Sequence, residues 1–139
     1  MLIRKAKEED RKQIIKLVDT LYCNSPFMKK EWRKKFNEFI LATFVVEIKK
    51  KIVGYIAFGF TKDSVYIGDL YILPEHRRKG LATRLLKVVE KIKEKFKKEN
   101  ILVDFREHNR GARKFYEKHG FKFLKKFGKL NHNLLRFRK

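Results

Sequence analysis

The sequence predicts an α/β fold, with one domain over residues 1–139 and a mixed, mostly antiparallel sheet of about seven strands flanked by four helices. Two observations predict this class. Apolar runs typical of strands alternate along the chain with segments whose apolar residues recur at helical spacing. The expected helices separate the strands into groups of one, three, one and two. Strands that follow one another without a helix favour antiparallel pairing.

The first half of the chain is expected to contribute two helices and four strands. Residues 8–21 have an acidic first turn and an apolar stripe at helical spacing, and residues 28–42 place their aromatic side chains on one side of a second helix. The strands are runs of β-branched, aromatic or alternating apolar residues. They cover residues 2–7, 43–48, 52–60 and 66–72.

The second half of the chain is expected to add two helices and three strands. Residues 80–99 carry one continuous apolar stripe that includes Phe96. Residues 109–119 form a short helix that Gly120 ends at its C-terminal cap. The remaining strands cover residues 101–106, 121–127 and 130–137.

The chain is strongly basic, with 37 Lys and Arg against 16 Asp and Glu and a formal net charge of +21. Such a field favours anionic ligands and surfaces, nucleic acid among them. No apolar run approaches the ~20 residues of a membrane span and the N-terminus lacks a signal peptide, so a cytoplasmic protein is expected. Cys23 is the only cysteine and the four histidines lack metal-ligand spacing, so no metal is predicted. The lysine enrichment also resembles the composition of thermophilic proteins.

A bend rich in cations precedes the helix that is expected from residue 80. Pro74 marks this bend, and Arg77, Arg78 and Lys79 end it. Positive charge at a helix N-terminus opposes the helix dipole and costs a few tenths to about 1 kcal/mol per residue. Three such residues are explained by a bound polyanion, so the bend predicts a pyrophosphate site. The alternative is a solvated basic turn.

Two motifs carry a resemblance to a known family. Residues 77–82 read RRKGLA, which matches neither the P-loop nor the dinucleotide fingerprint but does match R/Q-x-x-G-x-G/A. Residues 109–121 read NRGARKFYEKHGF and match N-x-x-A-x-x-F-Y-x-x-x-G-F. With DLYILPEH before the first motif, at residues 69–76, this order resembles the GNAT superfamily of acetyl-CoA-dependent N-acetyltransferases.

The resemblance implies a GNAT-like fold, with the fourth and fifth strands of the sheet splayed apart, and an acetyl-CoA site. Backbone groups of the fourth strand would bind the pantetheine arm, and N–H groups of the next bend and helix would bind the pyrophosphate. Small residues at 80 and 82 would allow close approach of the phosphate. The cofactor-binding residues implied are Leu70, Tyr71, Ile72, Arg77, Arg78, Lys79, Gly80, Leu81, Ala82, Thr83, Asn109, Ala112 and Phe115. For Thr83 and Asn109 helix capping is the alternative role, and for Phe115 core packing.

The resemblance also assigns catalytic roles in direct attack of a primary amine on the thioester. Tyr116 would protonate the departing CoA thiolate; plain packing is its alternative role. An amine with a pKa near 10.4 is only about one part in a thousand neutral at pH 7, so a base is needed. Asp69 and Asp104 are the candidates, and an ordinary salt bridge is the alternative for each. Backbone N–H groups near Ile72 would stabilise the oxyanion.

The acceptor and the partners stay open at this stage. The family sets acceptor specificity at residues 22–28 and 127–133, and neither segment contains an acidic residue. This disfavours a polycation as the acceptor unless Asp69, Asp104 and Glu107 provide local negative charge. A protein N-terminus, a lysine side chain and a small amine or polyamine are the candidates. The alternative function is a basic nucleic-acid-associated protein that keeps the fold without activity, although the aromatic residues are expected to be internal. No membrane is expected as a partner, and a monomer and a homodimer are equally compatible with the chain.

Overall fold

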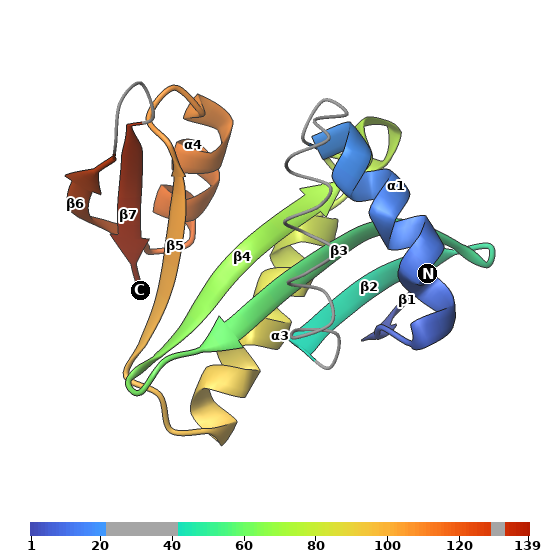
Figure 1. Ribbon diagram of the computed structural model, residues 1–139, viewed down its shortest axis with the longest axis horizontal. Helices are drawn as coiled ribbons and strands as arrows, with labels where there is room; N and C mark the ends of the chain where they lie inside the picture. Colours follow the sequence, from blue (N-terminus) through green and yellow to red (C-terminus); the bar gives the residue numbers. More distant parts are fainter. Residues whose placement is uncertain (22–41, 129–132) are drawn as a thin grey trace.

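The computed structural model describes residues 1–21, 42–128 and 133–139 (Figure 1). The expected helix over residues 28–42 falls almost entirely outside them. Three α-helices are described, α1 (Arg11–Leu21), α3 (Leu81–Lys95) and α4 (Arg110–Lys118), with two 3₁₀ turns, η1 (Glu8–Asp10) and η3 (Pro74–His76). The strands are β1 (Leu2–Lys5), β2 (Thr43–Ile48), β3 (Lys51–Phe60), β4 (Ser64–Ile72), β5 (Asn100–Arg106), β6 (Lys122–Phe127) and β7 (Leu134–Arg138).

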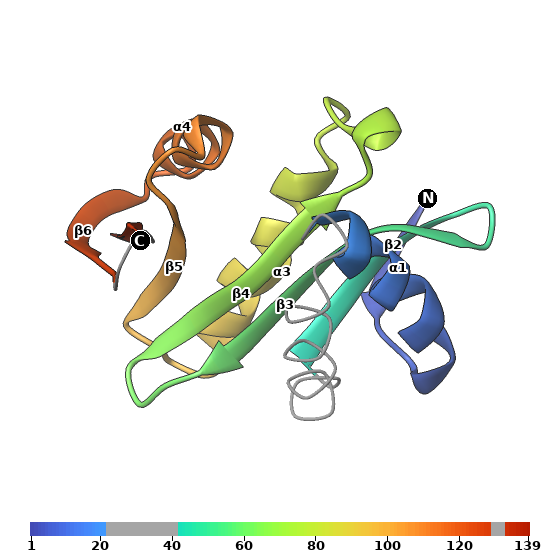
Figure 2. The ribbon, with the colours of Figure 1, turned by 45° about the horizontal axis from the view of Figure 1, so that its top comes forward.

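The seven strands form one mixed sheet in the order β1-β2-β3-β4-β5-β7-β6. All neighbouring pairs are antiparallel except β4 and β5, which run parallel. That pairing covers only Ser64–Ile67 of β4 and Asn100–Val103 of β5, and both strands continue beyond it unpaired with each other. Figures 1 and 2 show the two strands diverging toward the end of β4. The predicted α/β class and the splay of the fourth and fifth strands are confirmed.

Helices cover both faces of the sheet. On one face, α3 buries Leu81, Leu85, Leu86 and Val89 in a core shared with β2 to β5 and β7. On the other face, α1 buries Ile14, Leu17 and Val18 against β2 and β3. Figure 1 shows α1 in front of these strands and α3 behind them. No helix among the described residues is long and apolar enough to span a membrane.

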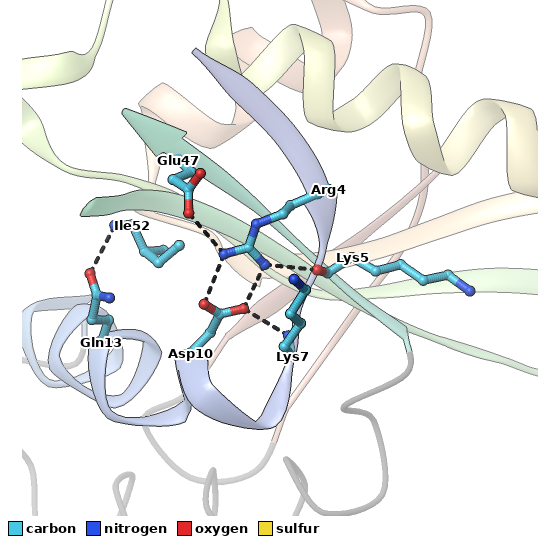
Figure 3. A network of polar contacts seen from close by, with 7 residues as sticks. All are labelled: Arg4, Lys5, Lys7, Asp10, Gln13, Glu47 and Ile52. Carbon is cyan, nitrogen blue, oxygen red and sulfur yellow. Dashed lines mark hydrogen bonds and ion pairs between the residues drawn. The ribbon is translucent and has the colours of Figure 1, made fainter. Parts of the chain in front are cut away.

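A buried ion pair fixes the start of α1 against the edge of the sheet (Figure 3). The Arg4 guanidinium donates to both Asp10 carboxylate oxygens, at 2.7 and 2.9 Å, and to Glu47 Oε1 at 3.0 Å. Asp10 is only 5% exposed and also accepts the Lys7 N–H at 2.7 Å. The Arg4 guanidinium thereby joins β1 to η1 and to β2.

Replacement of Asp10 by asparagine is expected to lower the free energy of unfolding by about 2 kcal/mol at neutral pH, because charge-assisted hydrogen bonds to Arg4 are lost. The hydrogen bonds from Arg4 lower the pKa of Asp10 below its ordinary value. A carboxylate whose pKa is lower in the folded state than in the unfolded state stabilises the fold. The full contribution is present above the unfolded-state pKa, near 3.9, and it is lost as pH falls through the folded-state pKa. Urea titrations should therefore show a difference from the parent protein that shrinks below about pH 4. Glu9→Gln, on the same turn but exposed, is the matched control, and a difference independent of pH would contradict the assignment.

The predicted end of one helix is wrong, and so is the predicted burial of three aromatic residues. The helix expected over 80–99 ends at Lys95, because Lys97 adopts a left-handed conformation (φ 52°) and the Lys98 N–H bonds the Lys93 carbonyl at 2.9 Å. This is the Schellman ending that glycine usually provides. Phe96 is therefore 53% exposed instead of extending the buried stripe, and Phe60 and Phe123 are also exposed instead of internal. The end predicted at Gly120 (φ 88°) is present.

Candidate active site

A β-bulge marks the place where β4 leaves β5. Ala57 of β3 pairs with Asp69, whereas the next residue, Phe58, pairs with Ile67, so Gly68 is the extra residue in β4. Ile67 is also the last residue of β4 that pairs with β5, opposite Val103. Among the described residues, the edge of β4 beyond the bulge has no strand partner on this side.

The free edge of β4 exposes backbone groups of alternate residues. The Leu73 N–H donates to Val53 of β3 at 2.9 Å. Peptide groups alternate between the two edges of a strand, so those of Tyr71 face β3 and those of Leu70 and Ile72 face the free edge. Leu70 and Ile72 can therefore bond an extended ligand as a neighbouring strand would.

The first turn of α3 forms an anion-binding geometry. Gly80 caps this helix in a left-handed conformation (φ 76°), and a Cβ built on it would meet nothing within 4 Å. The first bond of the helix runs from the Arg84 N–H to the Gly80 carbonyl at 3.1 Å. The N–H groups of Leu81, Ala82 and Thr83 consequently have no acceptor within the helix. Their orientation and the helix dipole favour a phosphate.

The three cations of the bend are not equivalent. The Arg77 Nε donates to the Ile72 carbonyl at 2.8 Å, and its guanidinium lies 5.3 Å from the centre of the Tyr71 ring. The Arg77 side chain is thus bound to the end of β4. Arg78 and Lys79 are exposed beside Gly80, so they are the cations whose side chains remain available to an anion.

Thr83 and His119 connect α3 to α4. The Thr83 Oγ1 lies 3.1 Å from the His119 Nε2, so this hydroxyl bonds across the two helices. Burial lowers the pKa of His119, and the charges of Lys118 and Lys139 lower it further. A neutral imidazole at this contact therefore persists at neutral pH. No local pattern indicates a function for His119, since its partner is 36 residues away.

Tyr116 of α4 is buried close to the charge of Asp69. Its ring packs against Phe105, Phe115 and Phe121, with centroid distances of 5.7, 5.1 and 5.1 Å. Burial raises the pKa of the Tyr116 hydroxyl above its ordinary value, and the charge of Asp69 raises it further. The hydroxyl therefore holds its proton at neutral pH, as a proton donor must.

Asp69 accepts a hydrogen bond from the Tyr55 hydroxyl, at 3.2 Å. Tyr55 is fully buried on β3. Sequence patterns do not distinguish this residue, because a tyrosine within an apolar strand is usually part of the core. Its hydroxyl fixes the Asp69 carboxylate at the bulge.

Asp104 has different surroundings. The Arg136 guanidinium binds it through two hydrogen bonds, Nε to Oδ1 at 2.8 Å and Nη2 to Oδ2 at 3.0 Å, and the Tyr66 hydroxyl also donates to Oδ2. Burial raises the pKa of Tyr66, and the hydrogen bond to Asp104 raises it further. Neither Tyr66 nor Arg136 could be identified from local sequence, because they lie 38 and 32 residues from Asp104.

The second motif lies on α4 beside this region. The Asn109 Oδ1 accepts the Ala112 N–H at 3.0 Å, so Asn109 caps the helix. Ala112 and Phe115 are partly buried and pack against the main core. In the described part of the chain, no group of three histidine, cysteine or acidic side chains is arranged to hold a metal ion.

Comparison with known proteins agrees with this geometry. The model of the acetyltransferase (GNAT) family matches residues 4–121. An N-alpha-acetyltransferase of Saccharolobus solfataricus is 32% identical over 137 residues, which cover 88% of this chain and 81% of the relative. Ard1 from Thermoplasma volcanium has a similar structure, with a TM-score of 0.85, 15% identity and coverage of 99% of this chain and 95% of that one. Arabidopsis thaliana Naa50, in complex with the bisubstrate analogue CoA-Ac-MVNAL, gives a TM-score of 0.80, 21% identity and coverage of 99% and 97%. The chain belongs to the GNAT family of acetyltransferases.

Proposed function

We propose that this acetyl-CoA-dependent N-acetyltransferase acetylates the N-terminal amine of a polypeptide. The observation that carries the proposal is the 32% identity to a relative named N-alpha-acetyltransferase, over most of both chains. The similar fold of Naa50, which was solved with an analogue joining CoA to a peptide, supports a peptide acceptor. The gap between β4 and β5 supplies the place where the two substrates would meet.

Acetyl-CoA would bind along the free edge of β4 and at the start of α3. Leu70 would bond the pantetheine arm through its backbone groups, and Ile72 through the second lone pair of its carbonyl oxygen, whose first accepts the Arg77 Nε. Tyr71 lies between them in the strand. The pyrophosphate would bind the N–H groups of the bend and of the first helical turn, where Gly80 leaves open space. The bend and turn comprise Arg77, Arg78, Lys79, Gly80, Leu81, Ala82 and Thr83. From α4, Asn109, Ala112 and Phe115 would contact the pantetheine arm.

The proposed reaction is direct attack in a ternary complex. The amine nitrogen forms a bond to the acetyl carbon, the carbon–sulfur bond breaks, and the electron pair leaves on sulfur. Tyr116 gives its proton to this thiolate, and the amine loses a proton to a carboxylate, directly or through water. The N–H of Ile72 faces the free edge and would stabilise the oxyanion.

Asp69 is the better placed of the two carboxylates to accept that proton. Both carboxylate oxygens of Asp104 already accept hydrogen bonds, from the Arg136 guanidinium and from the Tyr66 hydroxyl. Asp69 lies at the bulge where β4 leaves β5, and its charge acts on the Tyr116 hydroxyl. We therefore assign Asp69 as the base and Asp104 as the alternative.

An acceptor panel tests the proposed function. Acetyl-CoA is incubated with a peptide that has a free N-terminus and no lysine, with an N-formylated peptide that contains one lysine, and with spermidine. Release of free thiol is followed, and mass spectrometry locates the acetyl group. We expect acetylation of the first peptide at its N-terminal nitrogen. Transfer only to the lysine peptide or to spermidine would contradict the proposal.

A further inference from the structure

One face of the C-terminal part of the sheet carries five cations and one carboxylate, beside the apolar residues Leu102, Leu134 and Phe127. Residues paired across neighbouring strands point to the same face. Asp104 of β5 pairs with Arg136 of β7, which pairs with Lys125 of β6, and Arg138 likewise pairs with Lys122. Arg106 is two residues beyond Asp104 on β5 and so shares the face. We call the following residues the basic face: Asp104, Arg106, Lys122, Lys125, Arg136 and Arg138.

On β5 and β7, the opposite face is apolar and covered. Val103, Phe105, Leu135 and Phe137 are buried in the core shared with α3 and α4. On the basic face, Arg106, Lys122, Lys125 and Arg138 are exposed. Figures 1 and 2 show α1 over β2 and β3, away from β5, β7 and β6. The charged side chains therefore face outward.

The charge of the basic face is mostly unpaired. Its one carboxylate, Asp104, is neutralised by Arg136. The four other cations have no carboxylate partner among residues 1–21, 42–128 and 133–139. Four positive charges gathered on one face repel one another, so a ligand of opposite charge would stabilise this surface.

The basic face begins at the gap between β4 and β5. Val103 is the last residue of β5 that pairs with β4, and Asp104 follows it directly. Adjacent strands lie about 4.8 Å apart and an extended chain advances about 3.3 Å per residue. A polypeptide whose amine enters the gap would therefore cross β5, β7 and β6 with roughly its third to sixth residues.

We infer that the basic face binds acidic side chains at about the third to sixth positions of the acceptor polypeptide and makes acetylation selective for acidic N-terminal segments. The inference rests on the proposed function. Exposed guanidinium groups, such as those of Arg106 and Arg138, match carboxylates in charge and in planar geometry.

The aromatic rings on this side of the sheet favour a peptide over nucleic acid. The Phe127 ring lies under the Arg136 guanidinium at 4.9 Å and under the Lys125 ammonium at 5.5 Å, and Arg136 also lies 5.8 Å from the Tyr66 ring. Single strands are bound without sequence preference by open aromatic platforms on which bases stack. Here Lys125 and Arg136 lie over the Phe127 ring and Arg136 lies over the Tyr66 ring, so these rings are not open platforms for bases.

The test uses three peptides with the same first two residues and with glutamate, glutamine or lysine at positions three to six. Acetylation rates and, separately, peptide binding by fluorescence anisotropy are measured. We expect the glutamate peptide to exceed the lysine peptide at least tenfold in kcat/KM at about 50 mM salt, the equivalent of two or three exposed ion pairs. The ratio should fall toward one at about 500 mM salt, where the Debye length is a few ångströms.

Matched variants distinguish the effect of the basic face from the effect of the protein's overall positive charge. The double change Arg106→Gln with Arg138→Gln should reduce the glutamate-to-lysine ratio to less than threefold. Lys87→Gln with Lys91→Gln, two exposed cations on α3, removes the same charge elsewhere and should preserve the ratio. Circular dichroism melts verify that both variants are folded.

The outcomes distinguish this inference from the proposed function. Equal acetylation of the three peptides would overturn the inference while the function stands. Preferential binding of the glutamate peptide, lost in the Arg106 and Arg138 variant, with no acetylation of any peptide would leave the surface established and reject the function. Oligouridylate RNA that binds more tightly than the glutamate peptide, and depends on the same two arginines, would overturn the peptide as the occupant.

Discussion

Replacement of Tyr116 by phenylalanine is expected to lower kcat by about 10²-fold or more, with the affinity for acetyl-CoA nearly unchanged. The change removes only a hydroxyl, so the contacts of the ring with Phe105, Phe115 and Phe121 persist. Without the acid, sulfur leaves as a thiolate that only solvent can protonate. Single-turnover rates give the chemical step, and calorimetry gives the dissociation constant of acetyl-CoA.

Phe121→Leu, a buried residue whose ring packs against that of Tyr116 at 5.1 Å, measures how much of any loss comes from packing alone. Because burial and Asp69 raise the pKa of Tyr116, its proton is retained up to at least about pH 10. The parent enzyme should therefore show no loss of turnover from Tyr116 between neutral pH and that value. An unchanged kcat in Tyr116→Phe would remove the residue from the acid role.

Replacement of Asp69 by asparagine is expected to lower kcat/KM by about 10²-fold near neutral pH, because the attacking amine loses its proton acceptor. An N-terminal amine has a pKa near 8, so about a tenth of it is neutral at pH 7 and most of it at pH 9. The deficit should shrink as pH rises. Initial rates over this range, with one N-terminally free peptide, measure it.

Asp104→Asn is the matched comparison, since it makes the same change in the other carboxylate. It removes the negative partner of Arg136 and adds one positive charge to the basic face. We expect a loss of less than tenfold in kcat and a stronger preference for acidic peptides. A large loss in Asp104→Asn with little change in Asp69→Asn would transfer the role of base to Asp104.

Much of the fold could be predicted because its signals are local. The period of apolar residues identified α1, α3 and α4, and Gly120 marked the end of α4 through its positive φ. The end of α3 was missed because Lys97 occupies a left-handed position that glycine usually takes. Nothing in the local sequence distinguishes that lysine from its neighbours.

The two motifs identified the family for the same reason. A phosphate at a helix N-terminus needs backbone N–H groups and a residue without a large side chain. The six residues RRKGLA meet this requirement. The family model and the relatives confirm the assignment. The roles of individual residues in the motifs stay predictions.

The sequence by itself thus determined the elements, their order and the family, because each depends on residues close together in the chain. Only the tertiary structure decided which carboxylate binds a guanidinium and which cations share a face. These depend on β7 lying between β5 and β6 and on the bulge at Gly68. The first brings Arg136 to Asp104, and the second sets which side chains of β4 face α1. Contacts between residues more than 30 positions apart follow from strand pairing, which local sequence patterns do not specify.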